Sequence, residues 1–531
     1  MRCLTRFFVF GFVLVVLPTG AVDAQSGVER IVAEASIADL QRMMADGTLT
    51  SEATTAAFIG RIERLDGAFR SVIVVNPEAL DQARERDAER RAEQVRGPLH
   101  GIPVLLKDNI ESADPMATTA GSLALIGNVT GRDAGLVERL RDAGAVILGK
   151  TNLSEWANFR SEQSSSGWSG VGGQTRNPYD PTRSPCGSSS GSGVAVAAGF
   201  APVAIGTETN GSVVCPATSN GLVGIKPTVG LVSRFGVVPI SHTQDTAGPM
   251  ARTVADAVIT FGAMIGVDDR DPVTRIADRA ANWSLTDHLG PDGLRGKRIG
   301  VMRSNTGFHD KVDVLFERAL SDLRAAGATL VDDLEFESPD GLEQAAYDVL
   351  LYEFKHDLNL YLARLPGADR LPAATLEELI AFNDKHAEAE MPWFGQEIFL
   401  NSQAKGSLED PAYLDALGLT VDASRSGIDT LLTEHDLDAL VAPTGSAAWK
   451  IDLVNGDHFL GGSSSFPARA GYPNITVPMG TVHELPVGIS FIGTALSEPT
   501  LIEIASAYEH ATHRRVPPPL DMPAGCGVTG L

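Results

Sequence analysis

This 531-residue sequence predicts an α/β layered fold, and two observations carry that prediction. Amphipathic helical stretches alternate with short continuous apolar runs of the kind that form buried strands. The composition, with 43% hydrophobic and 21% charged residues, is that of an ordinary globular protein whose length allows a large core. Length alone would suggest three or four domains at about 150 residues each, but no clear linker divides the chain.

The N-terminal half begins with helices and then alternates. Ser36 to Asp39 resembles a capping box that opens one helix, and Ser51 opens a second that runs to about Leu65. The following elements are expected to be a charged helix over 77–93, a strand over 104–106, a helix over 136–143, a strand over 145–148, a helix over 192–198 and a strand over 203–205.

The C-terminal half continues the same alternation around one long helical region. Residues 340–435 carry Leu, Tyr and Phe at helical spacings and are expected to be a helical insert that walls a substrate cleft. The other expected elements are helices over 253–265, 312–325 and 501–510 and strands over 298–302, 329–331, 440–442, 474–477 and 488–492.

Residues 1–24 have the pattern of a secretory signal. Arg2 and Arg6 precede the apolar run 7–17, and small residues at 22–24 suit cleavage before Gln25. The alternative is a membrane anchor, but the apolar run has about half the length of a spanning helix. We therefore expect an exported protein, periplasmic or secreted, with residues 25–531 as the mature domain and no stable membrane insertion after cleavage.

The net charge limits which partners the protein could bind, and the spacing of the cysteines bears on whether it holds a metal ion. A net charge of −24 disfavours nucleic acid and anionic membranes, because both attract basic surfaces. Cys3 would leave with the signal, and the remaining Cys186, Cys215 and Cys526 have no metal-ligand spacing. No metal or cofactor is expected. Two buried thiols are the expectation for Cys186 and Cys215, with a disulfide between them left open.

Lys107 is the first candidate for catalysis. A serine nucleophile needs a proton acceptor, and most histidines of the chain lie in charged or loop contexts, with only His242 near glycine-rich apolar sequence. Lys107 follows the apolar run 102–106, and burial there would lower its pKa far below the ordinary value of about 10.4. From the local sequence alone, pairing with Asp108 or exposure to solvent is the more ordinary expectation.

Two serines in glycine-rich loops are the other candidates. Ser212 ends the stretch 206–212, where the successive backbone N–H groups of Thr209, Asn210, Gly211 and Ser212 could form an oxyanion hole around a tight turn at Gly211. Ser188 lies earlier in the chain, with one expected helix and one expected strand between it and Ser212. A chain that runs out along the helix and back along the strand could bring the two loops together. Either serine alone could equally be an ordinary loop residue.

Two motif matches are rejected because their structural context is wrong. Residues 144–151 fit the P-loop pattern, but the four residues between the glycines are Ala, Val, Ile and Leu, which favour a strand over a phosphate-binding loop. Residues 187–191 fit the G-x-S-x-G nucleophile elbow around Ser189, but that motif needs a strand directly before it, and 182–186 is not one.

Taken together, and in their order along the chain, the motifs around the lysine and the two serines resemble the amidase signature family. The matching stretches are 97–109 (GPLHGIPVLLKDN), 144–152, 177–199, 206–216, 221–228 and 244–249, and the specific part of the resemblance covers about 97–250. The resemblance implies a single α/β/α domain with one large mixed sheet flanked by helices. It also implies a Ser-Ser-Lys triad with Lys107 as base, Ser188 as bridging serine with a cis peptide bond, and Ser212 as nucleophile.

Within the family, the chain looks most similar to bacterial peptide amidases, which remove the C-terminal amide of peptides. The expected partner is therefore a small-molecule or peptide amide. Many relatives have Asp and Gly where this chain has Glu208 and Asn210. Alternatives are an esterase or aryl acylamidase on the same fold, a conventional serine hydrolase using Ser189 and a late histidine, and a non-catalytic exported peptide-binding protein.

Overall fold

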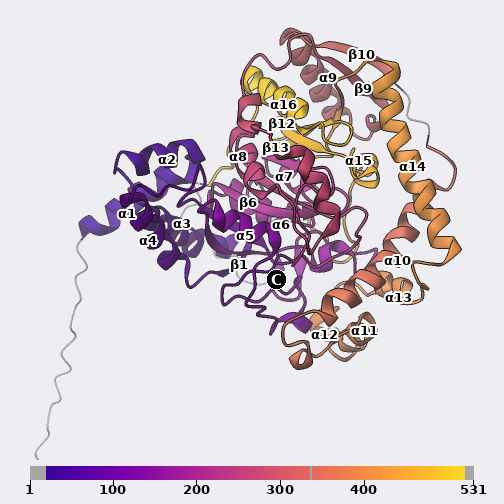
Figure 1. Cartoon of the computed structure of the whole chain (residues 1–531), viewed down its shortest axis with the longest axis horizontal. Coiled ribbons are helices and arrows are strands. Elements are labelled where there is room, and N and C mark those ends of the chain that lie inside the picture. The colour runs from indigo at the N-terminus through magenta and orange to yellow at the C-terminus, as the bar shows by residue number, and fades with distance from the viewer. Residues whose placement is uncertain (1–18, 335–337, 521–531) are drawn as a thin grey trace, which may run out of the picture.

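The computed structural model describes residues 19–334 and 338–520, so most of the predicted signal segment and Cys526 lie outside the described residues. One mixed sheet of eleven strands runs through the middle of the molecule, in the order β1-β3-β2-β6-β8-β7-β12-β13-β11-β9-β10. Helices flank this sheet (Figure 1), as the resemblance implies. The strands are β1 (Val72–Val75), β2 (Pro103–Lys107), β3 (Val146–Thr151), β6 (Val203–Glu208), β7 (Val223–Lys226), β8 (Thr246–Ala251), β9 (Arg298–Met302), β10 (Thr329–Leu334), β11 (Ala439–Pro443), β12 (Asn474–Val482) and β13 (Leu485–Ile492).

The sheet is parallel at two places and antiparallel elsewhere. Strand β2 pairs in parallel with β3 and β6, and β9 pairs in parallel with β10 and β11. Every residue of β2, β3 and β6 is buried, as expected for parallel strands covered on both faces. A separate two-stranded ribbon is formed by β4 (Trp168–Ser169) and β5 (Gly173–Gln174).

Four helices form a lobe at the left of Figure 1. They are α1 (Thr19–Glu34), α2 (Ile37–Ala45), α3 (Ser51–Leu65) and α4 (Ala79–Arg91). The capping box expected at Ser36 is confirmed, since Asp39 N donates to Ser36 Oγ at 3.0 Å and Ser36 N donates to Asp39 Oδ2 at 3.2 Å. The expected helix starting at Ser51 is confirmed as well.

The helices that accompany the sheet include one made almost entirely of small residues. They are α5 (Gly135–Asp142), α6 (Ser190–Ala197), α7 (Val214–Ser219), α8 (Val254–Met264), α9 (Asp310–Ala325), α15 (Ser465–Ala470) and α16 (Glu498–Thr512). All eight residues of α6 are buried. Its Gly191 lies so close to the backbone of Asn152 that an added Cβ would come 2.5 Å from the carbonyl oxygen, which explains the small side chains.

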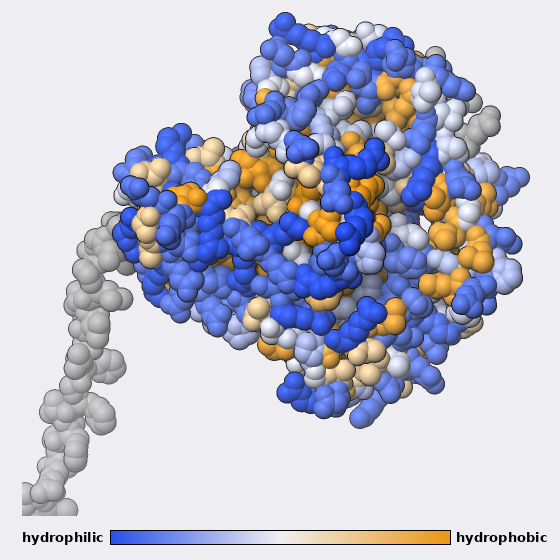
Figure 2. Space-filling model, in the orientation of Figure 1, coloured by the Kyte–Doolittle hydropathy of each residue, from blue (hydrophilic) through white to orange (hydrophobic). Residues whose placement is uncertain are grey.

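The helical region predicted over 340–435 forms a column at the right of Figure 1. It contains α10 (Leu342–Ala363), α11 (Leu376–Lys385), α12 (Ala387–Glu390), α13 (Glu397–Gln403) and α14 (Pro411–Glu434). Apolar side chains show on the surface of this column (Figure 2), where Leu360 and Leu414 are exposed. A cavity of about 680 Å³ lies between α14 and residues such as Val273 and Ile276 of the main body.

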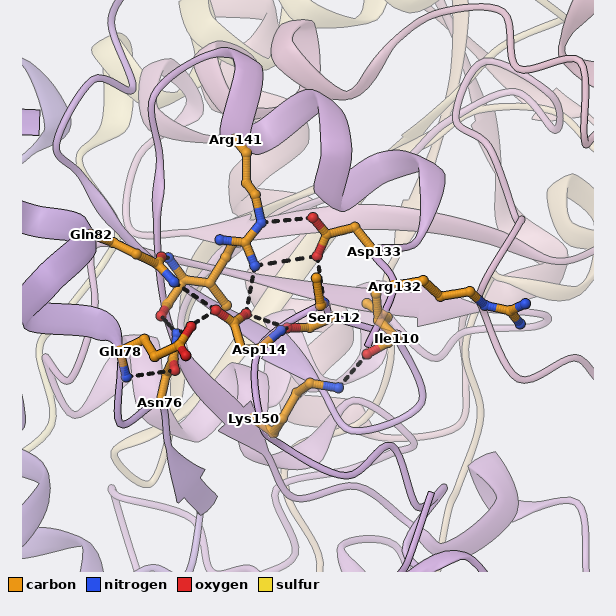
Figure 3. Close-up of polar contacts among 12 residues, drawn as sticks. Asn76, Glu78, Gln82, Ile110, Ser112, Asp114, Arg132, Asp133, Arg141 and Lys150 are labelled. Atoms are coloured by element: carbon orange, nitrogen blue, oxygen red, sulfur yellow. Dashed lines mark hydrogen bonds and ion pairs between the residues drawn. The ribbon is translucent and has the colours of Figure 1, made fainter. Parts of the chain in front are cut away.

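A polar network fixes the loop that follows β2 (Figure 3). Asp114 in this loop accepts hydrogen bonds from Asn76 at 2.9 Å and Gln82 at 2.6 Å, and it pairs with Arg141 of α5 at 2.6 Å. Because Asn76 and Gln82 also bond the backbone of Ile147 in β3, the loop is tied to the neighbouring strand.

The sequence patterns missed three strands of the large sheet: β1, β7 and β8. All the strands and helices named as expectations are found, mostly with boundaries shifted by a few residues. In the described part of the chain, no helix is long and apolar enough to cross a membrane.

Candidate active site

Lys107 lies at the carboxyl end of β2, fully buried. Its Nζ is 2.7 Å from Ser188 Oγ and 2.8 Å from Thr207 Oγ1, and it donates to the Thr207 carbonyl at 3.3 Å. Burial lowers the pKa of Lys107 to about 7, against the smaller opposing influence of Asp245 and Glu208. A substantial fraction of this amine is therefore neutral at neutral pH and able to accept a proton.

Asp108 does not pair with Lys107, so the more ordinary expectation for this lysine was wrong. The Asp108 side chain faces Lys150 of β3, with 3.9 Å between Oδ1 and Nζ, and it accepts a hydrogen bond from the Thr119 hydroxyl. Successive side chains of a strand point to opposite faces, which separates Asp108 from the face where Lys107 meets Ser188. Burial raises the pKa of Asp108 to about 6.

Ser188 lies in the loop before α6, and its peptide bond to Gly187 is cis, as the resemblance implies. Its carbonyl accepts a hydrogen bond from Ser154 N at 3.0 Å. The neighbouring Ser189 has another role: its hydroxyl donates to the Thr207 carbonyl at 3.1 Å and accepts from Thr207 N at 3.2 Å. The structure therefore brings Ser188, and not Ser189, to the lysine.

Ser212 closes a tight turn in which Gly211 has a φ of +84°, in the left-handed region that favours glycine. None of the four backbone N–H groups of Thr209, Asn210, Gly211 and Ser212 donates a hydrogen bond within the described part of the chain. The Ser212 side chain also has no partner there, and the residue is 8% exposed. The turn thus presents a hydroxyl and several free N–H donors to a ligand.

The two serine loops are joined in two ways. Ser189 N donates to the Ser212 carbonyl at 3.2 Å. Cys186 and Cys215 form a disulfide with a Cα–Cα distance of 5.9 Å, within the usual range. The expectation of two buried thiols was therefore wrong, and the disulfide that the sequence left open is formed. No hydrogen bond joins the side chains of Ser188 and Ser212.

Several contacts around the site were not expected from the sequence. Thr207 Oγ1 accepts a hydrogen bond from Asn109 Nδ2 at 2.9 Å, which holds the hydroxyl beside Lys107. Asp245 accepts from the Thr209 hydroxyl at 2.5 Å and so fixes the turn before Ser212. Glu208 accepts from Val213 N at 2.7 Å. Thr207 and Glu208 are the last two residues of β6, of which only 203–205 was expected as a strand. Nothing in the local sequence indicates that their side chains form hydrogen bonds around the site.

One group of side chains could in principle hold a metal ion. His242, Glu353 and Asp357 place their candidate ligand atoms within 4.8 Å of one another. However, Glu353 already accepts hydrogen bonds from Tyr413 at 2.7 Å and from the Ser241 hydroxyl, and His242 Nδ1 lies 2.8 Å from Asp357. These contacts account for the cluster as a polar junction between α10 and the main body.

Six of the eight residues of the motif at 144–151 form β3 (Val146–Thr151), with Lys150 buried, so the motif forms no phosphate-binding loop. What the site does offer is a buried lysine in contact with one serine, and a second serine in a turn with unoccupied N–H donors. That combination fits nucleophilic attack on a carbonyl carbon with stabilisation of the oxyanion.

Comparison with known proteins agrees with this chemistry. The sequence model of the family described as Amidase matches residues 53–502. A probable amidase of Arabidopsis thaliana is 40% identical over 97% of this chain and 98% of its own length.

Solved structures are similar over nearly the whole fold. The native peptide amidase of Stenotrophomonas maltophilia is 53% identical with a TM-score of 0.87, covering 92% of this chain and 99% of that chain. An amidase family protein of Bacillus anthracis is 36% identical with a TM-score of 0.85, covering 96% of both chains. This chain therefore belongs to the amidase signature family and is an amide-hydrolysing enzyme.

Proposed function

We propose that the enzyme hydrolyses amides through an acyl-serine, with Ser212 as nucleophile, Ser188 as proton bridge and Lys107 as base. The observation that carries this proposal is the 2.7 Å contact between Lys107 Nζ and Ser188 Oγ in a fully buried site. Burial holds the pKa of this lysine near 7, and a general base works best when its pKa lies near the operating pH.

The first half of the reaction forms the acyl-enzyme. Neutral Lys107 takes the proton of Ser188, which takes the proton of Ser212 as its oxygen attacks the amide carbon. The N–H groups from Thr209 to Ser212 hold the oxyanion of the tetrahedral intermediate. The contact between the two serine side chains forms when substrate is bound, since catalytic hydrogen bonds are often long without it.

The second half releases both products. Protonated Lys107 returns its proton through Ser188 to the leaving nitrogen, the C–N bond breaks, and ammonia departs from a primary amide. Water then attacks the Ser212 ester, giving up its proton through the same relay. The carboxylic acid leaves, and Ser212 and neutral Lys107 are restored.

The test is Ser212→Ala, with labelling by a fluorophosphonate probe in the unaltered protein. We expect the variant to lose at least a thousandfold in turnover, and the probe to label Ser212 only. Turnover near the unaltered level in Ser212→Ala would contradict the nucleophile assignment. Labelling and turnover retained in Ser212→Ala but lost in Ser189→Ala would instead support the conventional serine hydrolase. If the unaltered protein neither hydrolyses amides nor reacts with the probe, the result would support the peptide-binding alternative.

For substrate, we propose the C-terminal amide of peptides. The support is the 53% identity to a peptide amidase over nearly all of the described fold. Ammonia release from peptide amides, anilides and the corresponding esters distinguishes the candidates. Faster turnover of anilides or esters than of peptide amides would favour the acylamidase or esterase alternative.

We also propose that the protein is exported, to the periplasm or the medium. Two features support this: the signal pattern over 1–24 and the disulfide between Cys186 and Cys215, since structural disulfides persist mainly in oxidising compartments. N-terminal sequencing of the protein expressed with residues 1–24 should give a start near Gln25. A retained Met1 would contradict export by this signal.

A further inference from the structure

Asp245 lies opposite Thr209, directly beyond the paired parts of β6 and β8. In this antiparallel pair Glu208 is opposite Thr246. Continuing the same register by one residue places Thr209 opposite Asp245, and partners directly opposite on neighbouring strands bring their side chains close together. The hydrogen bond that Thr209 Oγ1 donates to Asp245 Oδ1 at 2.5 Å agrees with this placement. Asp245 therefore contacts the oxyanion turn at its first residue.

The carboxylate of Asp245 is itself held on its other oxygen. Asp245 Oδ2 accepts hydrogen bonds from Ile240 N at 2.8 Å and from Ser241 N at 2.9 Å. The hydroxyl of Ser241 donates in turn to Glu353 of α10, whose side chain is fully buried. Asp245 is thus anchored to the helical region 340–435, and it holds the Thr209 side chain from that support.

The charge of Asp245 also acts on the catalytic lysine. Thr207, whose hydroxyl lies 2.8 Å from Lys107 Nζ, is the second residue before Thr209 in the chain. Two acidic groups oppose the fall in the pKa of Lys107 that burial causes, and the influence of Asp245 is larger than that of Glu208. A negative charge on Asp245 therefore favours the protonated amine, and its removal would lower the pKa of Lys107 further.

The surroundings of Asp245 decide whether it carries that charge. Burial raises the pKa of Asp245 to about 6, against the hydrogen bonds that it accepts and the charge of Arg234. Arg234 is itself paired with Asp271 at 2.6 Å. Asp245 is thus mostly ionised at pH 7, where Lys107 exchanges its proton. It lines a cavity of about 390 Å³ whose other titratable residues are Arg132, His242, Arg270, Asp357, Tyr361 and Arg364.

The turn that Asp245 holds supplies the donors of the proposed oxyanion hole. Removing one such donor lowers kcat by about 10²–10³ in comparable enzymes, and a displacement of about 1 Å can cost about 10²-fold. These donors act on the tetrahedral oxyanion more strongly than on the bound amide. A misplaced turn should therefore lower kcat and leave KM nearly unchanged.

We propose that Asp245 is a positioning residue that acts on both parts of the site: it holds the oxyanion turn through the Thr209 hydroxyl, and its negative charge favours the protonated form of Lys107. The inference rests on the proposed acyl-serine mechanism at Ser212. Its two parts can be measured separately, because the Thr209 hydroxyl can be removed while the charge of Asp245 remains.

The first experiment compares Thr209→Val, which removes the hydroxyl with little change of shape, with Thr209→Ser, which keeps it. With the amide that the enzyme turns over fastest, we expect Thr209→Val to lower kcat about 10–100-fold with KM changed less than about threefold. Thr209→Ser should retain kcat within about threefold. Equal losses in the two variants, or no loss in Thr209→Val, would overturn the positioning role.

The second experiment uses Asp245→Asn, which removes the charge and keeps the shape of the side chain. We expect kcat to fall at least as far as in Thr209→Val. The midpoint of kcat/KM against pH should move below that of the unaltered enzyme, because the amine of Lys107 loses a proton more readily without the neighbouring anion. In Thr209→Val, where the charge remains, the midpoint should stay nearly in place.

The matched control is Asp256→Asn on α8. Asp256 is also a buried carboxylate that accepts a backbone hydrogen bond, from Ile37 N at 2.9 Å, but it belongs to neither serine loop. Its kcat and pH midpoint should be those of the unaltered enzyme. Thermal unfolding of every variant identifies any that does not fold, and if Asp245→Asn is one of them, the Thr209 pair still decides the positioning role.

A pH midpoint that does not move in Asp245→Asn, or that moves equally in Asp256→Asn, would overturn the inference even if Ser212→Ala is inactive. Full activity in Ser212→Ala would instead overturn the mechanism on which the inference rests.

Discussion

Two lysines lie fully buried on the adjacent parallel strands β2 and β3, where Lys107 is opposite Thr151 and Lys150 is opposite Leu106. Lys107 contacts two hydroxyls and a carbonyl, those of Ser188 and Thr207. Lys150 contacts the Ile110 carbonyl and the Thr118 hydroxyl at 2.9 Å, with the Asp108 carboxylate at 3.9 Å. Equal burial thus gives different chemistry, because only Lys150 has an acidic side chain within ion-pairing distance.

The comparison teaches that burial alone does not identify a catalytic lysine. Burial lowers the pKa of both side chains. Lys150 is part of a structural junction: its Nζ lies 3.9 Å from Asp108 Oδ1 and donates to the Ile110 carbonyl in the loop shown in Figure 3. Lys107 is held beside a hydroxyl that can exchange a proton with it. The side chains that surround each lysine, and not its burial, therefore determine whether it is catalytic or structural.

The largest expected effect is on turnover. Lys107→Ala should reduce kcat/KM by about 10²–10⁴, the usual contribution of a general base. The melting temperature should change little, because the lost packing and the lost hydrogen bonds to Ser188 and Thr207 oppose the relief of a desolvated amine. Steady-state kinetics and thermal unfolding on the same preparation check this, with Lys150→Ala as the matched variant. Equal turnover losses in the two variants would remove the distinction between the lysines.

The next effect is on stability. Lys150→Met leaves the buried Asp108 without its cation, and breaking such a pair costs about 3–5 kcal/mol of unfolding free energy. Denaturant unfolding measures the loss. Combining Lys150→Met with Asp108→Asn should restore part of it, since the stranded charge is removed. A Lys150→Met protein as stable as the unaltered one would show that the 3.9 Å pair contributes nothing.

Besides the backbone hydrogen bond from Ser189 to Ser212, a disulfide joins the two serine loops beside Lys107. Replacing Cys186 and Cys215 by serine should cost about 2–4 kcal/mol of stability. Turnover should fall more than in the Lys150→Met variant when both are measured under folding conditions, because the two serines lose their fixed separation. Dithiothreitol should reduce the turnover of the unaltered enzyme in the same way. It should not change the turnover of the variant in which Cys186 and Cys215 are replaced by serine. Full activity after verified reduction would contradict this role.

A smaller effect is expected on the pH dependence of stability, through the buried side chain of Glu155. Glu155 lies with Arg160, 2.7 Å away, and faces Glu390 at the end of α12 across Gly170. Burial, together with the Glu390 charge, raises the pKa of Glu155 to about 8. Between the ordinary glutamate pKa of about 4.3 and 8, the folded protein binds a proton that the unfolded chain releases. Stability from this group is therefore lost as pH rises through that window.

Glu155→Gln should remove this dependence. Melting temperatures measured from pH 5 to pH 9 should decline less steeply in Glu155→Gln than in the unaltered protein. Glu434→Gln, at an exposed position of α14, serves as the control and should not change the slope. Parallel curves for Glu155→Gln and the unaltered protein would show that Glu155 holds no proton at neutral pH.

Much of this could be predicted from the sequence, and two causes explain features that were missed. The β2 run, the turn at Gly211 and the small-residue helix α6 are local patterns, so Lys107 and the serine loops could be found. The disulfide, the Thr207 hydroxyl beside Lys107 and the Asp108–Lys150 pair depend on which strands become neighbours. Strands β7 and β8 were missed because their Gly, Pro and Lys content lacks a strand pattern.

The pH dependence of kcat/KM is the most direct test of the central claim that Lys107 acts as a neutral base. Activity in the unaltered enzyme should rise with an apparent pKa near 7, falling about tenfold for each pH unit below it, because the protonated amine cannot accept the Ser188 proton. The residual activity of Lys107→Ala should lack this step. A profile that is flat from pH 5.5 to pH 8, or a step that persists in Lys107→Ala, would contradict the account.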